Sequence, residues 1–118
     1  MANLHKFTVQ EAMNAAGSGG NWTATSKGTA ADGSSADGNT THYAVTSGVH
    51  QLGIFADVEI KFNFTTAATD IDVSEDDELR LPDSTLVFLT VPRGLGNTIY
   101  FNYISSSAST GSVRIVEI

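Results

Sequence analysis

The chain has 118 residues and no cysteine, and its 13 acidic residues against 6 lysines and arginines give a net charge of −7. This length fits one domain, and a chain without cysteine forms neither disulfides nor thiolate metal sites. The cations are scattered singly, so the several phosphate contacts that nucleic-acid binding needs are not available. No signal peptide or membrane anchor is expected, because no apolar run approaches the ~18 residues of a membrane span and the first ten residues have no apolar core.

Residues 1–16 predict an arm that contains one short helix. Thr8 suits the cap position, and Glu11 follows three residues later, as in a capping box. Gly17 would end the helix. Its apolar face would consist of Val9, Ala12, Met13 and Ala16. A helix of about two turns is marginal alone, so we expect it to lie on a surface.

Residues 17–42 form a zone rich in glycine, serine and threonine, which by composition indicates a flexible loop. Asp32-Gly33 and Asp37-Gly38 are turn dipeptides within it. Trp22 is its only large apolar residue and the expected anchor. If the zone is ordered, either pairing within the chain or packing between copies would hold it.

Residues 43–118 carry the alternation of β-strands. Val58–Phe64 and Ile99–Tyr103 alternate apolar and polar positions, which predicts half-buried strands. Leu86–Val91 is apolar on both faces and predicts a central or an inter-chain strand. Further strands are expected at 43–46, 49–55 and 113–118.

The predicted fold class is therefore mostly β: an antiparallel β-sandwich or jelly roll with a short N-terminal arm or helix. Within this single domain, residues 1–42 are the N-terminal arm and loop, and residues 43–118 are the sandwich core. A small barrel is the alternative.

The sequence predicts no active site. The histidines are His5, His42 and His50, and the spacing of eight between the last two is not that of a zinc site. The serine cluster at 105–109 lacks a nucleophile elbow, and Gly94-Leu95-Gly96 lacks the third glycine of a dinucleotide loop and reads as a turn. We therefore expect a protein that is not an enzyme.

The acidic run over residues 70–78 is the sharpest local feature. Asp70, Asp72 and Asp76 could supply carboxylates to one calcium ion, although the run lacks the glycine and spacing of an EF-hand. The simpler alternative is a solvated loop that keeps a sheet edge from pairing. A third alternative is contact with a basic patch on a partner. No cofactor other than calcium is expected.

Three segments of the C-terminal part carry a resemblance: Leu81–Ser84, Leu89–Asn102 and Thr110–Val116. Together they resemble small head-decoration, or capsid cement, proteins of tailed bacteriophages. The resemblance implies a sandwich or jelly roll with an arm that grips the shell, and no catalytic residues.

The function implied is that of a virion structural protein on the capsid surface, which stabilises the shell by binding between major capsid subunits. Its partners would be the major capsid protein and, in a homotrimer, copies of itself. Expected contact residues lie in the arm and loop: Leu4, Phe7, Val9, Met13 and Trp22.

Two other binding functions stay open. A carbohydrate-binding or adhesin-like module of a phage fibre would stack sugars on aromatic rings, with the candidates Trp22, Tyr43, Tyr100 and Tyr103. A tail or neck assembly subunit would share the fold and the arm.

Overall fold

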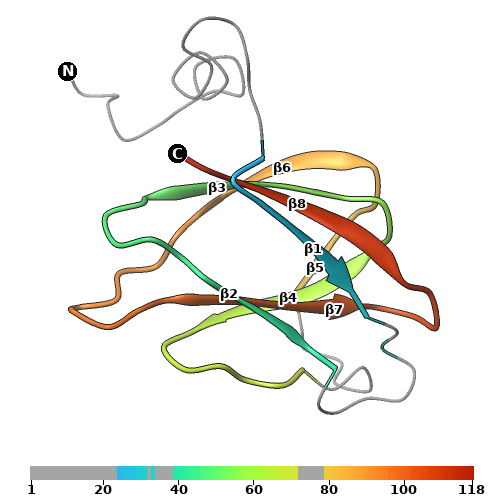
Figure 1. The fold of residues 1–118 in the computed structure, drawn as a ribbon, viewed down its shortest axis with the longest axis horizontal. Coiled ribbons are helices and arrows are strands. Elements are labelled where there is room, and N and C mark those ends of the chain that lie inside the picture. Colours follow the sequence, from blue (N-terminus) through green and yellow to red (C-terminus); the bar gives the residue numbers. More distant parts are fainter. Residues whose placement is uncertain (1–23, 32, 34–38, 72–78) are drawn as a thin grey trace, which may run out of the picture.

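The fold is an all-β sandwich of two four-stranded sheets (Figure 1). The computed structural model describes residues 24–31, 33, 39–71 and 79–118, and these residues contain no helix. None of them therefore forms a helix with the length and apolarity to cross a membrane. The strands are β1 Ser26–Ala30, β2 Thr41–Ala44, β3 Gln51–Ala56, β4 Ile60–Thr65, β5 Leu79–Leu81, β6 Thr85–Thr90, β7 Tyr100–Ser105 and β8 Gly111–Glu117.

Strand order identifies the sandwich as a jelly roll. One sheet, sheet A, has the order β1-β8-β3-β6, and the other, sheet B, has the order β2-β7-β4-β5. All neighbours are antiparallel. Successive strands switch between the sheets except at the β4–β5 pair, as in the two Greek keys of a jelly roll. The predicted fold class is confirmed, while the arm helix over residues 8–16 lies outside the described residues.

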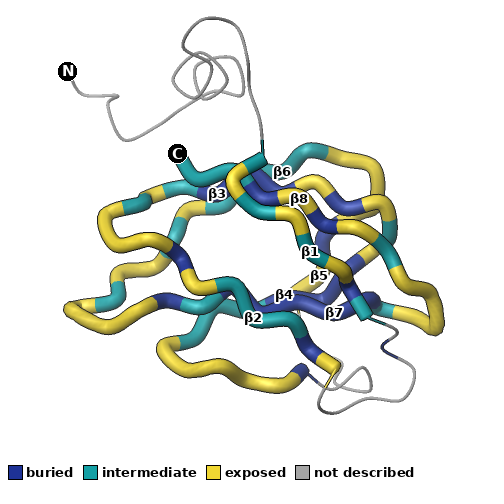
Figure 2. Tube along the Cα trace, viewed as in Figure 1, coloured by how far each residue is buried: buried dark blue, intermediate teal, exposed yellow. Residues whose placement is uncertain are grey.

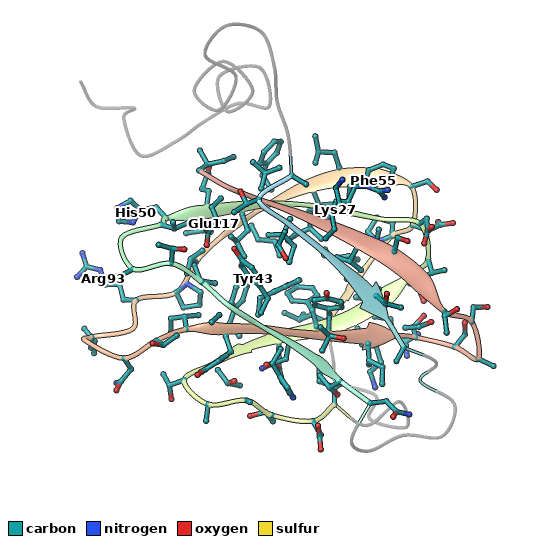
Figure 3. The ribbon with its side chains drawn as sticks, viewed as in Figure 1. Lys27, Tyr43, His50, Phe55, Arg93 and Glu117 are labelled. Atoms are coloured by element: carbon teal, nitrogen blue, oxygen red, sulfur yellow. The ribbon has the colours of Figure 1, made fainter. Side chains whose placement is uncertain are left out.

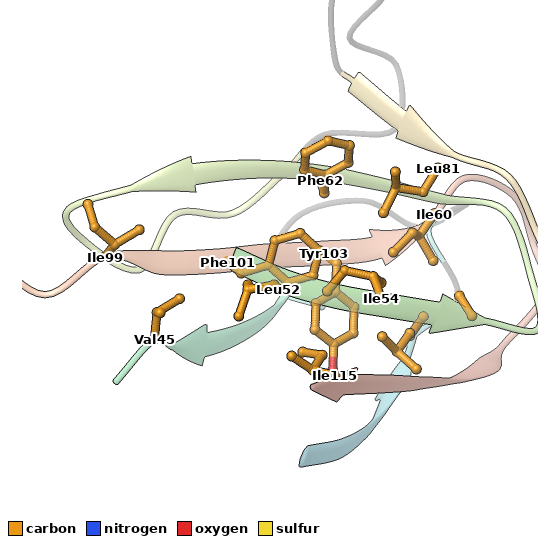
Figure 4. Packing of buried hydrophobic residues seen from close by; sticks show 13 residues of the cluster. Val45, Leu52, Ile54, Ile60, Phe62, Leu81, Ile99, Phe101, Tyr103 and Ile115 are labelled. Carbon is orange, nitrogen blue, oxygen red and sulfur yellow. The ribbon is translucent and has the colours of Figure 1, made fainter. Parts of the chain in front are cut away.

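The core lies between the two sheets and is rich in aromatic rings. Phe62 and Phe64 on β4 pack against Phe101 on β7, with centroid separations of 5.6 and 5.3 Å, and Tyr103 follows Phe101 at 5.5 Å. Sheet A covers these rings with aliphatic side chains, which Figure 4 shows in close-up. Buried positions concentrate on the facing strands, and the loops at both ends are exposed (Figure 2). Removing one such ring costs about 3–5 kcal/mol.

Strand β1 lies inside the zone that composition assigned to a flexible loop. The loop interpretation is wrong for Ser26–Ala30, which pairs with β8 from Ser26↔Ile115 to Ala30↔Gly111. Pairing within the chain therefore holds this stretch in place. Glycine serves here as a strand residue: a Cβ on Gly28 would lie 2.2 Å from the Tyr103 hydroxyl. Only a residue without a side chain lets the buried tyrosine span the two sheets at this point.

Strand β6 occupies an edge of sheet A and pairs with β3 alone among the described strands. The prediction of a central strand over Leu86–Val91 is therefore wrong, and the inter-chain alternative stays open. Both faces of β6 are apolar, and they lie against different surroundings. Val87 and Leu89 pack against the core, while Leu86 and Phe88 lie on the outer face of the sheet.

We expect Gly28→Ala to lower the free energy of unfolding by about 1–3 kcal/mol, because the new methyl group overlaps the Tyr103 hydroxyl. The matched variant is Tyr103→Phe, which removes that oxygen and leaves the nearest ring carbon 3.5 Å from the new methyl. In urea denaturation, the double variant should lose clearly less stability than the sum of the two single losses. Simple additivity would contradict the clash.

Candidate functional site

The candidate site is a groove at one end of the sandwich, between the β2–β3 connection (45–50) and the β6–β7 connection (91–99). Backbone hydrogen bonds hold the two connections together: Val45 N donates to Ile99 O at 2.9 Å, and Val91 N donates to His50 O at 2.8 Å. The groove has a volume of about 310 Å³, and an adjoining hollow of about 420 Å³ shares six of its lining residues: Gly48, Val49, Val91, Pro92, Gly94 and Leu95.

A carboxylate from β8 secures the first wall of the groove. Glu117 Oε2 accepts a hydrogen bond from Thr46 N, and Glu117 Oε1 accepts one from Thr46 Oγ1, both at 2.8 Å. The Tyr43 hydroxyl also bonds this carboxylate, and Figure 3 shows Tyr43 and Glu117 facing each other between the sheets. We call these three residues the Glu117 clasp; it ties the edge strand of sheet B to sheet A.

The clasp shifts the protonation of both ionisable partners. Burial, followed by the hydrogen bond and charge of Glu117, raises the pKa of Tyr43 well above its ordinary value, so the hydroxyl stays protonated and donates. Burial alone would raise the pKa of Glu117, but the hydrogen bonds from Thr46 and Tyr43 outweigh it and lower that pKa below 4.5. The carboxylate is therefore ionised at neutral pH.

The second wall ends in a tight turn that holds a leucine out in solvent. Asn97 N donates to Gly94 O at 2.9 Å, and the two central residues, Leu95 and Gly96, have φ of 51° and 92°. Positive φ at both positions is the signature of a type I′ turn. A bulky residue seldom adopts this backbone, yet Leu95 does so and its side chain is 88% exposed. The turn interpretation of this glycine-rich segment is confirmed.

The ionisable side chains at this end of the sandwich line the hollow and not the groove itself. Among the described residues of the hollow they are His50 and Arg93, both exposed. Figure 3 shows these two side chains at the same end of the sandwich. The groove is lined by aliphatic residues together with glycine and small polar residues, so it offers hydrogen-bonding groups as well as apolar contacts.

The predicted metal site is described only in part. Asp70 is exposed and its Oδ1 lies 3.7 Å from His42 Nε2, while Asp72 and Asp76 lie outside the described residues. Within the described part of the chain, no three histidine or acidic side chains gather as metal ligands do. The calcium hypothesis stays a prediction.

His42 belongs to a polar network on the outer face of sheet B. Asn102 is fully buried there, and its amide nitrogen donates to Asn63 Oδ1 at 2.7 Å and to Thr65 Oγ1 at 2.8 Å. The Asn102 oxygen must then accept from His42 Nδ1, 2.7 Å away, so this nitrogen carries the proton. The network is structural, because it satisfies the buried amide of Asn102.

The sequence predicted only a small part of the candidate site. The predicted partner-contact residues Leu4, Phe7, Val9, Met13 and Trp22 all lie outside the described residues. The groove and the Glu117 clasp were not predicted, because they join residues 43–49, 91–99 and 117, which only the strand order brings together. The one local signal was Gly94-Leu95-Gly96, a turn sequence with an apolar residue at its tip.

Comparison with known proteins found no match among family models, curated proteins or solved structures. The function is therefore inferred from the residues of this chain.

We expect Glu117→Gln to destabilise the protein by about 1 kcal/mol at pH 7, because the partly exposed clasp loses its charge-assisted hydrogen bonds. The pKa of Glu117 is lower in the folded than in the unfolded protein, so its stabilisation is present above pH 4.5 and is lost as the pH falls through the folded value. Urea denaturation of both proteins at several pH values should show their difference shrinking below pH 4.5. A difference that does not change with pH would contradict this.

Proposed function

We propose that this protein is a virion structural protein that decorates a phage capsid and stabilises it by binding between major capsid subunits. It acts by binding and not by catalysis, and it resides on the capsid surface. The observation that carries the proposal is Leu95, an apolar side chain held in solvent by an unfavourable backbone beside a groove of mixed aliphatic and polar lining. Strain of this kind is retained where the surroundings or a function require it.

The position of the groove supports an assembly role. Residues 91–99, its second wall, fall within Leu89–Asn102, the longest of the three segments that resemble capsid cement proteins. Jelly rolls are also a recurrent fold of viral capsid domains, although they serve lectins as well. The fold alone therefore leaves both classes open, and the exposed Leu95 beside the groove supports contact with a protein partner.

The described part of the chain begins at the groove end of the sandwich. Thr25, the second described residue, accepts a hydrogen bond from Glu117 N at 3.0 Å, and the Glu117 carboxylate in turn holds Thr46 of the groove wall. An arm over residues 1–23 and the groove would thus engage one surface of the shell. In this proposal the arm residues Leu4, Phe7, Val9, Met13 and Trp22 contact capsid subunits, and the homotrimer stays a prediction.

We expect Leu95→Asn to raise stability and weaken binding together. Asparagine tolerates the left-handed backbone, so the turn should gain about 1 kcal/mol. Loss of a buried leucine contact, worth about 1.5–3 kcal/mol, should weaken capsid binding at least about tenfold. The measurement is co-sedimentation with capsids that lack decoration, alongside urea denaturation of the free protein.

The matched control is Leu79→Asn on β5, another exposed leucine, with 63% of its surface accessible. It should bind capsids as the wild type does, at a saturating ratio per major capsid subunit. Equal binding by wild type and Leu95→Asn would contradict a role for the groove. If no variant binds capsids while the protein binds glycans, the carbohydrate-binding alternative gains support.

Deletion of residues 2–20 tests the arm separately. We expect the truncated protein to keep its sandwich, because the described strands begin at Ser26, and to lose capsid binding. Circular dichroism checks the fold, and co-sedimentation checks the binding. Normal capsid binding by the truncated protein would contradict the arm as the main contact.

A further inference from the structure

Gln51 on β3 carries a buried acceptor that lacks a donor. Its Oε1 atom is shielded from solvent, and no donor among the described residues bonds it. Gln51 lies on the outer face of sheet A, because Leu52 and Ile54 point into the core and successive side chains of a strand alternate. Buried polar atoms are rarely left unpaired, since each unpaired atom costs stability. A donor is therefore expected above this part of sheet A.

The outer face beside Gln51 is apolar. Val116, Gly53 and Phe88 stand opposite one another across β8, β3 and β6 and form one row, which we call the outer row. Gly53 contributes no side chain, and the Phe88 ring leans into that space: a Cβ on Gly53 would lie 3.1 Å from it. Phe55 belongs to the next row and is 36% exposed, and Figure 3 shows it on the outer side of sheet A. This face therefore offers apolar contact next to a buried acceptor.

The described chain begins close to the outer row. Thr25 Oγ1 accepts a hydrogen bond from Glu117 N at 3.0 Å, which fixes Thr25 beside the end of β8. Trp22 precedes Thr25 by three residues, a span of at most about 10 Å. Strand β8 alone separates β1 from β3, so two strand spacings of about 4.8 Å must be crossed. The indole of Trp22 is therefore within reach of the outer row and of Gln51.

Tryptophan has the chemistry that matches both features of this face. Its ring buries a large apolar area, and its indole N–H is a single donor that usually finds an acceptor when it is buried. The chain contains one tryptophan, Trp22. The other aromatic residue outside the described ranges is Phe7, which has no donor in its side chain. Trp22 is thus the aromatic residue of the N-terminal segment that can satisfy Gln51 while it covers the outer row.

We propose that, in the free protein, Trp22 docks on the outer face of sheet A of its own chain, with its ring on the outer row and its Nε1–H donating to Gln51 Oε1. The occupant of this face is the chain's own N-terminal segment. Docking fixes the point on the sandwich from which residues 1–20 extend. The inference concerns the protein without capsids and does not rest on the proposed function; contact of Trp22 with a capsid subunit would replace this contact on binding.

Tryptophan fluorescence of the purified full-length protein tests the docking, because Trp22 is the only tryptophan. Its emission should be blue-shifted from that of the urea-unfolded chain, resist quenching by acrylamide, and stay the same at every protein concentration. Val116→Asn should lower the ratio of docked to undocked indole about tenfold, because an apolar contact of the outer row becomes polar. Quenching by acrylamide should rise accordingly.

The hydrogen bond is measured separately by NMR, in which the protein gives one indole N–H resonance. Exchange of this proton with solvent should be slow in the wild type and about fivefold faster in Gln51→Leu, which keeps the bulk of the side chain but removes the acceptor. The matched control is Leu79→Asn on β5 of sheet B, which should change neither quenching nor exchange. Circular dichroism should show the folded sandwich for all three variants.

Three results would overturn the proposal. Emission equal to that of the unfolded chain would show that the indole of Trp22 is in solvent. Emission that shifts with protein concentration would assign the contact to a second copy of the chain. A protected indole that neither Val116→Asn nor Gln51→Leu exposes would place Trp22 elsewhere, such as in the groove. Because capsids take no part, these results are independent of the proposed function.

Discussion

The packing of one buried tyrosine between the two sheets is the constraint on which the sandwich depends. Tyr103 extends from β7 to β1, where its hydroxyl occupies the space above Gly28. That contact requires glycine at this point of β1, and the ladder with β8 holds the strand in sheet A although the segment has little β propensity of its own. Tertiary packing therefore overrides local preference here. With β1 in place the jelly roll has both its sheets complete, and the loops at its end are brought together.

The candidate site shows how the fold creates a surface from separate parts. The Glu117 clasp joins the last strand to the β2–β3 connection, and backbone bonds join that connection to residues 91–99. These ties hold the groove walls in position, so the strained turn at Leu95 presents its side chain on a rigid support. A turn held in one backbone conformation loses less entropy on binding than a mobile loop does. This would suit the proposed binding to capsid subunits.

The two faces of the sandwich are built differently. On the outer face of sheet B, Asn102 is fully buried and its amide is satisfied by a hydrogen-bond network. Sheet A presents Phe55 and the rows beside β6 on its outside. Buried amides must find partners, and covered faces provide them.

The sequence by itself determined the fold class, because a period of two in the apolar residues of segments such as Val58–Phe64 is a local property of the chain. It also located the turn at Gly94-Leu95-Gly96 and the double-sided apolarity of Leu86–Val91. Only the tertiary structure decided that Ser26–Ala30 is a strand, that β6 lies at an edge, and that Glu117 meets Thr46. These features join residues far apart in the chain, and their energies come from packing and hydrogen bonds that no local pattern contains.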